Sequence, residues 1–288
     1  MLIVSYNIQY GLGRDGQYDL ARIANEIRDA DIICLQEVER FWQRSGMLDQ
    51  PAELAALLGN YYWVYGANLD VDASIVDSQA KIHNRRRQFG TMTLSRRPIL
   101  SSRNFPLPKY GALSQHSIQQ GILETVIDTD AGILRVYNTH LSHLCAETRL
   151  PQIEAMMSIF SRAPDEGGAW CGGHPDPSSG WTEGTMPPMP TDMILMGDLN
   201  CLPDSCEYNR LIGPKSPVHG RLIRHNGLMD AWVAAGQDEA QGITHPNVGG
   251  RIDHCLLSPR LGQNVRRCWA DMANMGSDHY PLWVQLQE

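Results

Sequence analysis

Short runs of apolar residues recur along the chain, and most of them end directly in polar residues. Runs of this kind, bounded by Gly, Pro, Asn or Asp, are typical of buried β-strands. They predict strands at residues 2–8, 31–37, 61–68, 118–128, 133–138, 193–197, 252–257 and 282–286.

Three further segments repeat their apolar residues at the spacing of an α-helix. The first is 20–27, where Asp19 is a candidate N-cap, and the others are 47–58 and 147–160. Because helices alternate with strands and some strands follow one another directly, the pattern predicts a layered α/β or α+β protein. It argues against a helix bundle and against an all-β sandwich.

One long segment, 163–192, has neither pattern and is rich in Gly, Pro and Ser. It is too long for a plain connection in a compact domain, so we interpret it as a loop insert. A lid over a binding site, with Trp170 and Trp181 as contact residues, is favoured over a disordered insert. No internal repeat and no linker divides the chain, so we expect a single domain over residues 1–288.

The composition is that of an ordinary globular protein: 288 residues, 42% hydrophobic and 19% charged. No stretch approaches the ~20 apolar residues of a membrane-spanning helix. The first residues form a predicted strand and lack the basic region and cleavage site of a secretion signal. We therefore expect a cytoplasmic protein with no membrane span, and no obligate protein partner is evident.

Acidic residues outnumber basic ones: 32 Asp and Glu against 24 Lys and Arg give a net charge of −8. An acidic protein gains little from counterion release on long nucleic acids. The balance favours a small phosphorylated substrate, and nucleic acid stays an alternative. The basic run at 83–87 is either a solvated loop, which we favour, or a clamp for phosphate.

The seven cysteines are scattered and contain no C-x-x-C pair. In a reducing compartment they are most simply buried thiols. Cys201 and Cys206, with His219 nearby, offer a zinc site as a weaker alternative, because no second close pair completes a tetrahedral set.

The predicted strand at 193–197 runs straight into Asp198, Leu199 and Asn200. Side chains alternate along a strand, so Asp198 and Asn200 are expected to point to the same side while Leu199 points away. A plain Asp/Asn turn explains this stretch as well as a functional site does. The other strand ends are needed to decide between the two.

Acids, amides and histidines recur at the ends of the other predicted strands. Each has a structural explanation of its own: Glu37 as a turn cap, His140 as a satisfied core histidine, Asp253 as the partner of Arg251. Those explanations do not account for the shared position, and strand ends are where α/β folds gather their ligand sites. The residues in question are Asn7, Glu37, Asn138, His140, Asp278 and His279, together with Asp253, which lies inside a predicted strand and is flanked by Arg251 and His254.

Together these stretches resemble the endonuclease/exonuclease/phosphatase superfamily, which has the deoxyribonuclease-I-like fold. The resemblance implies a four-layered α/β sandwich with two central mixed β-sheets flanked by helices. It also implies cleavage of phosphodiesters or phosphomonoesters with a divalent cation. The matching stretches are, in order, "SYNIQ", "LQE", "FGTMTLSR", "NTHL", "GDLN", "GLMDAW", "RIDH" and "SDHYPL".

For the metal, the resemblance implies Mg²⁺, with Mn²⁺ as an alternative. Glu37 offers the hard carboxylate oxygen that these ions prefer. Asn7 assists near the metal and the phosphate, and Asp278 joins directly or through water. Some nucleases of the superfamily carry an acidic ligand where this chain has the neutral Gln9. That departure favours a single-metal site built on Glu37.

For the reaction, the resemblance implies that Asp198 activates or orients the attacking water. Asn200 then hydrogen-bonds a phosphate oxygen, and His140 and His279 contact the phosphoryl group. Asp253 orients His279 and raises its basicity.

Three functions are compatible with these residues. We favour a metal-dependent phosphoesterase that acts on a small or lipid-derived substrate. An endonuclease or exonuclease acting on DNA or RNA is the alternative, disfavoured by the net charge of −8 and the lack of a long basic stripe. A catalytically inactive binding protein is the least favoured, because it would be expected to have lost some of the site residues.

Overall fold

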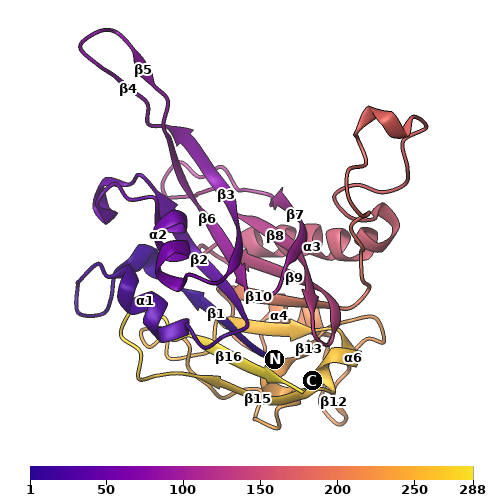
Figure 1. Ribbon diagram of the computed structural model, residues 1–288. Coiled ribbons are helices and arrows are strands. Elements are labelled where there is room, and N and C mark those ends of the chain that lie inside the picture. Colours follow the sequence, from indigo (N-terminus) through magenta and orange to yellow (C-terminus); the bar gives the residue numbers. More distant parts are fainter. Residues whose placement is uncertain (288) are drawn as a thin grey trace.

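The computed structural model describes residues 1–287 and shows two six-stranded β-sheets packed face to face, with helices on both outer sides (Figure 1). The first sheet runs in the order β15 (Val265–Ala270), β16 (Leu282–Leu286), β1 (Leu2–Asn7), β2 (Ile32–Arg40), β6 (Arg86–Ser95) and β3 (Tyr62–Asp72). The second runs in the order β13 (Met229–Asp230), β14 (Asp253–Leu257), β10 (Met193–Asp198), β9 (Gly132–His140), β8 (Gly121–Thr129) and β7 (Ile99–Pro106).

Both sheets are mixed, because β1 and β2 are parallel, as are β9 and β10, while their neighbours are antiparallel. Helices α1 (Leu20–Ile27) and α2 (Gln50–Leu58) cover the outer face of the first sheet. Helices α3 (Ala146–Glu166) and α4 (Cys206–Ile212) cover that of the second. The four layers confirm the predicted fold class.

Shorter elements connect these layers. There are two small helices, three 3-10 turns and two small hairpins: α5 (Ala231–Ala234), α6 (Pro259–Gly262), η1 (Gln9–Gly11), η2 (Gln43–Ser45), η3 (Pro177–Ser179), β4 (Ile75–Val76) with β5 (Ile82–His83), and β11 (Lys215–Ser216) with β12 (Gly220–Arg221).

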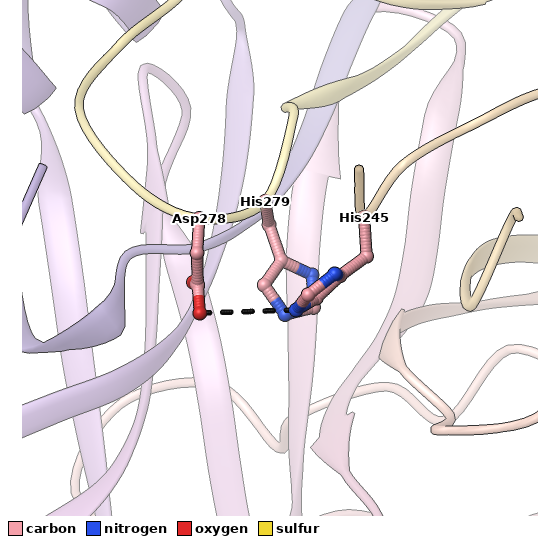
Figure 2. Close-up of side chains that lie close together, drawn as sticks. All are labelled: His245, Asp278 and His279. Carbon is pink, nitrogen blue, oxygen red and sulfur yellow. Dashed lines mark ion pairs between the residues drawn. The ribbon is translucent and has the colours of Figure 1, made fainter. Parts of the chain in front are cut away.

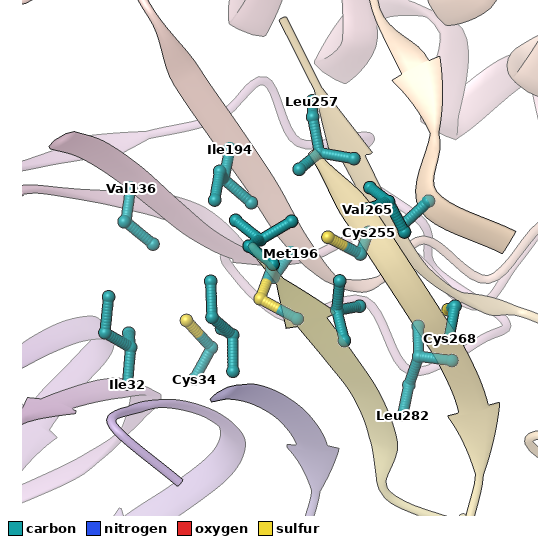
Figure 3. Packing of buried hydrophobic residues seen from close by; sticks show 14 of the residues in the cluster. Ile32, Cys34, Val136, Ile194, Met196, Cys255, Leu257, Val265, Cys268 and Leu282 are labelled. Carbon is teal, nitrogen blue, oxygen red and sulfur yellow. The ribbon is translucent and has the colours of Figure 1, made fainter. Parts of the chain in front are cut away.

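The central core lies between the two sheets (Figure 3). Ile32 and Cys34 of the first sheet pack against a cluster that includes Val136 and Met196 of the second, and all four side chains are buried. Burial of this apolar surface is the main force that holds the sheets together. At the edge where polar residues end the strands, hydrogen bonds replace this apolar packing.

The segment at 70–88 is a projecting β-hairpin arm rather than a plain polar connection (Figure 1). Strand β3 continues to Asp72, β6 begins at Arg86, and β4 and β5 form the tip. The Arg86 guanidinium lies 2.8 Å from the carboxylate of Asp70 across the pair of strands. Such cross-strand ion pairs stabilise a hairpin that sequence patterns alone describe as polar.

Helix α3 is longer than predicted, since it runs from Ala146 to Glu166. The first four residues of the predicted loop insert at 163–192 therefore form the last turn of the helix. Ala163, in this last turn, is buried. No helix within residues 1–287 is both long and apolar enough to cross a membrane.

A buried ionic network supports β14 from behind. The Arg251 guanidinium lies 2.8 Å from the carboxylate of Asp230, and the Tyr208 hydroxyl donates to the same carboxylate at 2.7 Å. Arg251 also lies 2.9 Å from Nδ1 of His254, whose Nε2 is 2.9 Å from the carbonyl oxygen of Cys201. Arg251 is thus the partner of Asp230 and not of the neighbouring Asp253.

Burial, reinforced by the adjacent Arg251, lowers the pKa of His254 to about 4. In the unfolded chain the pKa returns to about 6.5. The unfolded state therefore binds a proton between these two values while the folded state does not, so stability is lost as the pH falls through this range.

We predict that the His254→Gln variant loses this pH dependence. The free energy of unfolding of the wild type should fall by roughly 3 kcal/mol more than that of the variant between pH 6.5 and 4. Urea unfolding at several pH values measures the difference. Parallel curves for the two proteins would show that His254 is not held neutral.

Candidate active site

The predicted site residues gather around one cavity of about 320 Å³ at the ends of β9 and β10. They come from both sheets and from the loop that precedes β16. Glu37, His140, Asp198, Asn200, Asp278 and His279 line the cavity, while Asn7 and Asp253 lie directly behind it and hydrogen-bond to the lining residues.

Asp198 is the centre of this group. Its side chain is buried, and its Oδ2 accepts a hydrogen bond from the amide of Asn7 at 3.0 Å. Nε2 of His140 lies 3.5 Å from the same oxygen, and Nε2 of His279 lies 3.6 Å from it. The Asn7 hydrogen bond holds this carboxylate in one orientation, with both imidazole rings close to the same oxygen.

Asn200 reaches the cavity by a different route from the one that strand alternation predicts. Strand β10 ends at Asp198, and Asn200 has a φ of 50°, in the left-handed region. Its backbone N–H donates to Oδ1 of Asp198 at 2.9 Å, which is an Asx turn. The turn and the site are therefore the same feature, and the left-handed residue brings Asn200 to the cavity that Asp198 lines.

Gly197 allows β10 to come this close to β9. It has a φ of 148°, and a Cβ at this position would lie 1.9 Å from the carbonyl oxygen of Thr139. Only glycine fits here, which explains why the Gly-Asp-Leu-Asn stretch begins with a glycine.

Glu37 does not end a strand, because β2 continues to Arg40. The pairing of β2 with β6 instead shifts register between Leu35 and Val38, which is a β-bulge, and Glu37 has a φ of 58°. Bulges turn a side chain away from its regular direction. This one aims the carboxylate of Glu37 into the cavity.

The amide of Asn7 donates to Glu37 at 3.2 Å as well as to Asp198. The backbone N–H of Gln9 donates to Oδ1 of Asn7 at 3.1 Å and so fixes the direction in which the amide points. In this orientation Asn7 positions two carboxylates, and its service as a metal ligand stays a prediction.

His279 is held by a second carboxylate behind the cavity. Its Nδ1 lies 2.8 Å from Oδ2 of Asp253, and both side chains are buried. Burial alone would lower the pKa of His279, but the charges of Asp253 and Asp198 outweigh it and raise the pKa to about 10. The imidazole is therefore cationic at neutral pH and presents Nε2 to the cavity.

The loop that carries Asp278 and His279 is fixed to the end of β1. The hydroxyl of Ser277 donates to the carbonyl oxygen of Asn7 at 2.6 Å and accepts from the backbone N–H of His279 at 3.2 Å. This serine explains why the Ser-Asp-His stretch comes next to residues from the opposite end of the chain.

His140 is not a satisfied core histidine. It is 6% exposed, its Nε2 lies 3.5 Å from Asp198, and its buried Nδ1 has no hydrogen-bond partner within residues 1–287. An unpaired buried nitrogen beside a carboxylate is typical of a functional position rather than of packing.

The family model for the Endonuclease/Exonuclease/phosphatase family matches residues 4–279. The chain belongs to this family. Members of the family are hydrolases that act on phosphoester bonds and generally depend on a divalent metal. The resemblance drawn from the sequence is thereby confirmed.

Several solved structures have a similar fold. A mannosyl-6-phosphatase from Bacteroides thetaiotaomicron superimposes with a TM-score of 0.64 at 18% identity, covering 100% of each chain. The catalytic domain of human Nocturnin, with a bound sulfate anion, gives 0.59 at 18% identity, covering 100% of this chain and 94% of that chain. Truncated Caenorhabditis elegans TDP2 gives 0.55 at 18% identity, covering 100% and 97%. Among curated protein sequences, none matches significantly.

His245 is a site residue that the sequence analysis missed. Its Nε2 lies 3.8 Å from Oδ2 of Asp278, and its ring packs edge-on against that of His279 with the centroids 4.5 Å apart (Figure 2). The backbone N–H of Val248 donates to its Nδ1 at 3.3 Å, so in the neutral ring the proton is on Nε2 and faces Asp278. In the sequence, the only link between His245 and the candidate site is its place next to Thr244, near Asp253. No sequence pattern marks that link.

The outer wall of the cavity was missed as well. Tyr10, Trp42 and Arg44 line it, and the Arg44 guanidinium lies 3.8 Å from the centroid of the Tyr10 ring and 4.8 Å from that of Trp42. Arg44 also pairs with the buried Glu39 at 2.8 Å, which fixes the guanidinium against both rings. Such a wall is suited to contact the part of a substrate beyond its phosphate.

Two sequence interpretations find no support. The thiol of Cys206 lies against the carboxylate of its neighbour Glu207, and the cysteines join no metal-like cluster within residues 1–287. The segment 167–192 projects from the end of α3, and none of its residues lines the cavity (Figure 1). The zinc site is thus not formed, and the lid is not seen over the site.

We predict that Asp253 and His279 act as one unit. Asp253→Asn and His279→Gln should each lower kcat strongly, and the double variant should lose little more than the worse single variant, because coupled groups are not additive. A double-mutant cycle, in which kcat is measured with a phosphoester that the protein hydrolyses, gives the coupling between the two residues. The exposed Asp165→Asn is the control. Losses that simply multiply would disprove the coupling.

Proposed function

We propose that the protein is a metal-dependent phosphoesterase that hydrolyses a small phosphorylated substrate, with Asp198 activating the attacking water. The observation that carries the proposal is the convergence on Asp198 of His140, His279 and the Asn7 amide inside one cavity. The general base Asp198, the two phosphate-binding imidazoles and the positioning amide are then all within reach of a single phosphoryl group.

The residues present fit a divalent cation. Three carboxylates, Glu37, Asp198 and Asp278, line the cavity, and none of them forms an ion pair with Lys or Arg within the described residues. Carboxylate oxygens are the ligands that Mg²⁺ and Mn²⁺ prefer. Glu37 and Asp278 would hold the ion, and when bound it would neutralise charge on the phosphoryl oxygens.

The side chains of the protein supply the remaining chemistry. The Oδ2 of Asp198 accepts the proton of the attacking water. His279, cationic at neutral pH, donates from Nε2 to a phosphoryl oxygen and is kept in place by Asp253. Asn200 has one N–H bound to the carbonyl oxygen of Leu141 at 3.0 Å and a second available for the phosphate.

The charge of the protein supports a small substrate over a long nucleic acid. The net charge is −8, and in the basic run at 83–87 Arg86 is paired with Asp70 and His83 with Asp77. The run thus offers less free positive charge than its sequence suggests. A nuclease activity is the outcome that would replace this part of the proposal.

A cytoplasmic location is part of the same proposal. All seven cysteines are free thiols, which fits a reducing compartment.

A substrate panel tests the proposal directly. Phosphomonoesters of sugars, lipid headgroup phosphodiesters and single- and double-stranded oligonucleotides should be compared with Mg²⁺ or Mn²⁺. We expect turnover of a small ester and little cleavage of oligonucleotides. Preferential cleavage of oligonucleotides would establish the nuclease alternative, and no turnover of any ester would overturn the proposal.

We predict that a chelator abolishes turnover and that Mg²⁺ or Mn²⁺ restores it. The Glu37→Gln variant should lose most activity at moderate metal concentration, because the amide is a weaker ligand than the carboxylate. The exposed Glu53→Gln is the matched control. Full activity in excess chelator would rule out the metal-dependent reaction.

We predict that Asp198→Asn lowers kcat by roughly 10²–10⁴-fold, the range for loss of one acid–base group. Asn200→Ala removes a hydrogen-bond donor and should cost on the order of 3 kcal/mol in the transition state. Measurements of kcat and of the melting temperature on the same proteins separate chemistry from folding. A stable and fully active Asp198→Asn enzyme would reduce Asp198 to a turn residue.

A further inference from the structure

A second cavity, of about 380 Å³, lies at the other end of the second sheet. Arg135, near the start of β9, and Met193, at the start of β10, line it, and these two residues are paired across the strands. His140, five positions further along β9, pairs with Asp198 in the same register, so the two cavities are about 17 Å apart. They share no lining residue.

Arg135 is buried in this cavity without a carboxylate partner. It is 1% exposed, and within residues 1–287 no acidic group lies within ion-pair distance of it. Its Nη2 donates to the carbonyl oxygen of Thr191 at 3.1 Å, its Nη1 lies 3.7 Å from the sulfur of Met189, and its Nε has no partner. The guanidinium also lies 5.5 Å from the centroid of the Tyr137 ring.

The buried Arg251 and the partly buried Arg149 both have carboxylate partners. Arg251 is paired with Asp230 at 2.8 Å, and Arg149 with Glu207 at 2.7 Å. A guanidinium keeps its charge in proteins, and a buried charge without a counter-ion is costly. Arg135 therefore stands out as a buried cation without a carboxylate partner among residues 1–287.

The rest of the cavity suits an anion with an apolar body. A second arginine, the exposed Arg224, lines it and forms no ion pair within the described residues. Phe160 and Leu228 contribute apolar surface. Two cationic groups beside apolar walls match a small organic anion, since each part of such a molecule finds its complement.

We propose that this cavity is a second binding site, separate from the candidate active site, for a small organic anion. A carboxylate or phosphate of the ligand pairs with Arg135 and Arg224, and its apolar body packs against Phe160 and Leu228. The ligand supplies the counter-charge that Arg135 lacks.

The test uses benzoate and phenyl phosphate as anionic probes and benzamide as the neutral analogue of benzoate. Binding is measured by calorimetry and by the shift of the melting temperature, in chelator, on the full chain. The phenyl phosphate arm uses the Asp198→Asn variant so that the probe is not hydrolysed. We expect benzoate, phenyl phosphate or both to bind and to raise the melting temperature, and benzamide to do neither.

The variants locate the site. Arg135→Met should weaken binding of the anion by about 10- to 100-fold, the worth of one charge-assisted contact, and Arg224→Gln several-fold. Glu37→Gln, in the other cavity, should leave benzoate binding unchanged. Binding of benzoate alone identifies a carboxylate site, and binding of phenyl phosphate alone a phosphate site.

Three results would overturn the proposal: neither anion binds, benzamide binds as well as benzoate, or the anion binds Arg135→Met as tightly as the wild type. Arg224 is exposed, so Arg224→Gln is expected to fold whatever happens to Arg135→Met. If Arg135→Met does not fold, unchanged affinity in Arg224→Gln overturns the proposal in its place.

Discussion

The side-chain amide of Asn7 joins the two sheets at the point where the candidate chemistry lies. It donates to Glu37 of the first sheet and to Asp198 of the second, at 3.2 and 3.0 Å. Two carboxylates so close together repel each other unless donors lie between them. The rest of the site follows from this contact, because His140 and His279 are then gathered around the same oxygen of Asp198.

Behind Asn7, the side-chain amides of Gln36 and Asn138 also link the two sheets. Gln36 of β2 donates to Oδ1 of Asn138 of β9 at 2.8 Å, and Asn138 donates to the backbone carbonyls of Leu35 and Met92. Gln36 and Asn138 are buried, and these hydrogen bonds between their amides and the opposite sheet fix the register between the sheets more narrowly than apolar packing does. Asn138 thus has a structural role, whereas the other polar residues at these strand ends face the cavity.

The two ends of strand β9 have opposite electrostatic character. At its end, His140 lies in a cavity with three carboxylates that lack Lys or Arg partners among the described residues, which calls for a cation. Near its start, Arg135 is a buried cation without a carboxylate, which calls for an anion. The same rule, that a buried charge needs a counter-charge, supports both the proposed metal site and the proposed anion site in one sheet.

The sequence by itself determined the layered fold and the family, and it predicted six of the residues that line the first cavity, because apolar periodicity and the polar strand ends are local properties. Asp198 could also be singled out from the sequence, because it stands at the end of a predicted strand. Only the tertiary structure decided how Glu37 and Asn200 reach the cavity, since a bulge and a left-handed residue depend on pairing with neighbouring strands. It also decided the places of His245 and Arg135, whose surroundings come from segments distant in sequence. Burial and missing partners exist only once the chain is folded, and no local pattern contains them.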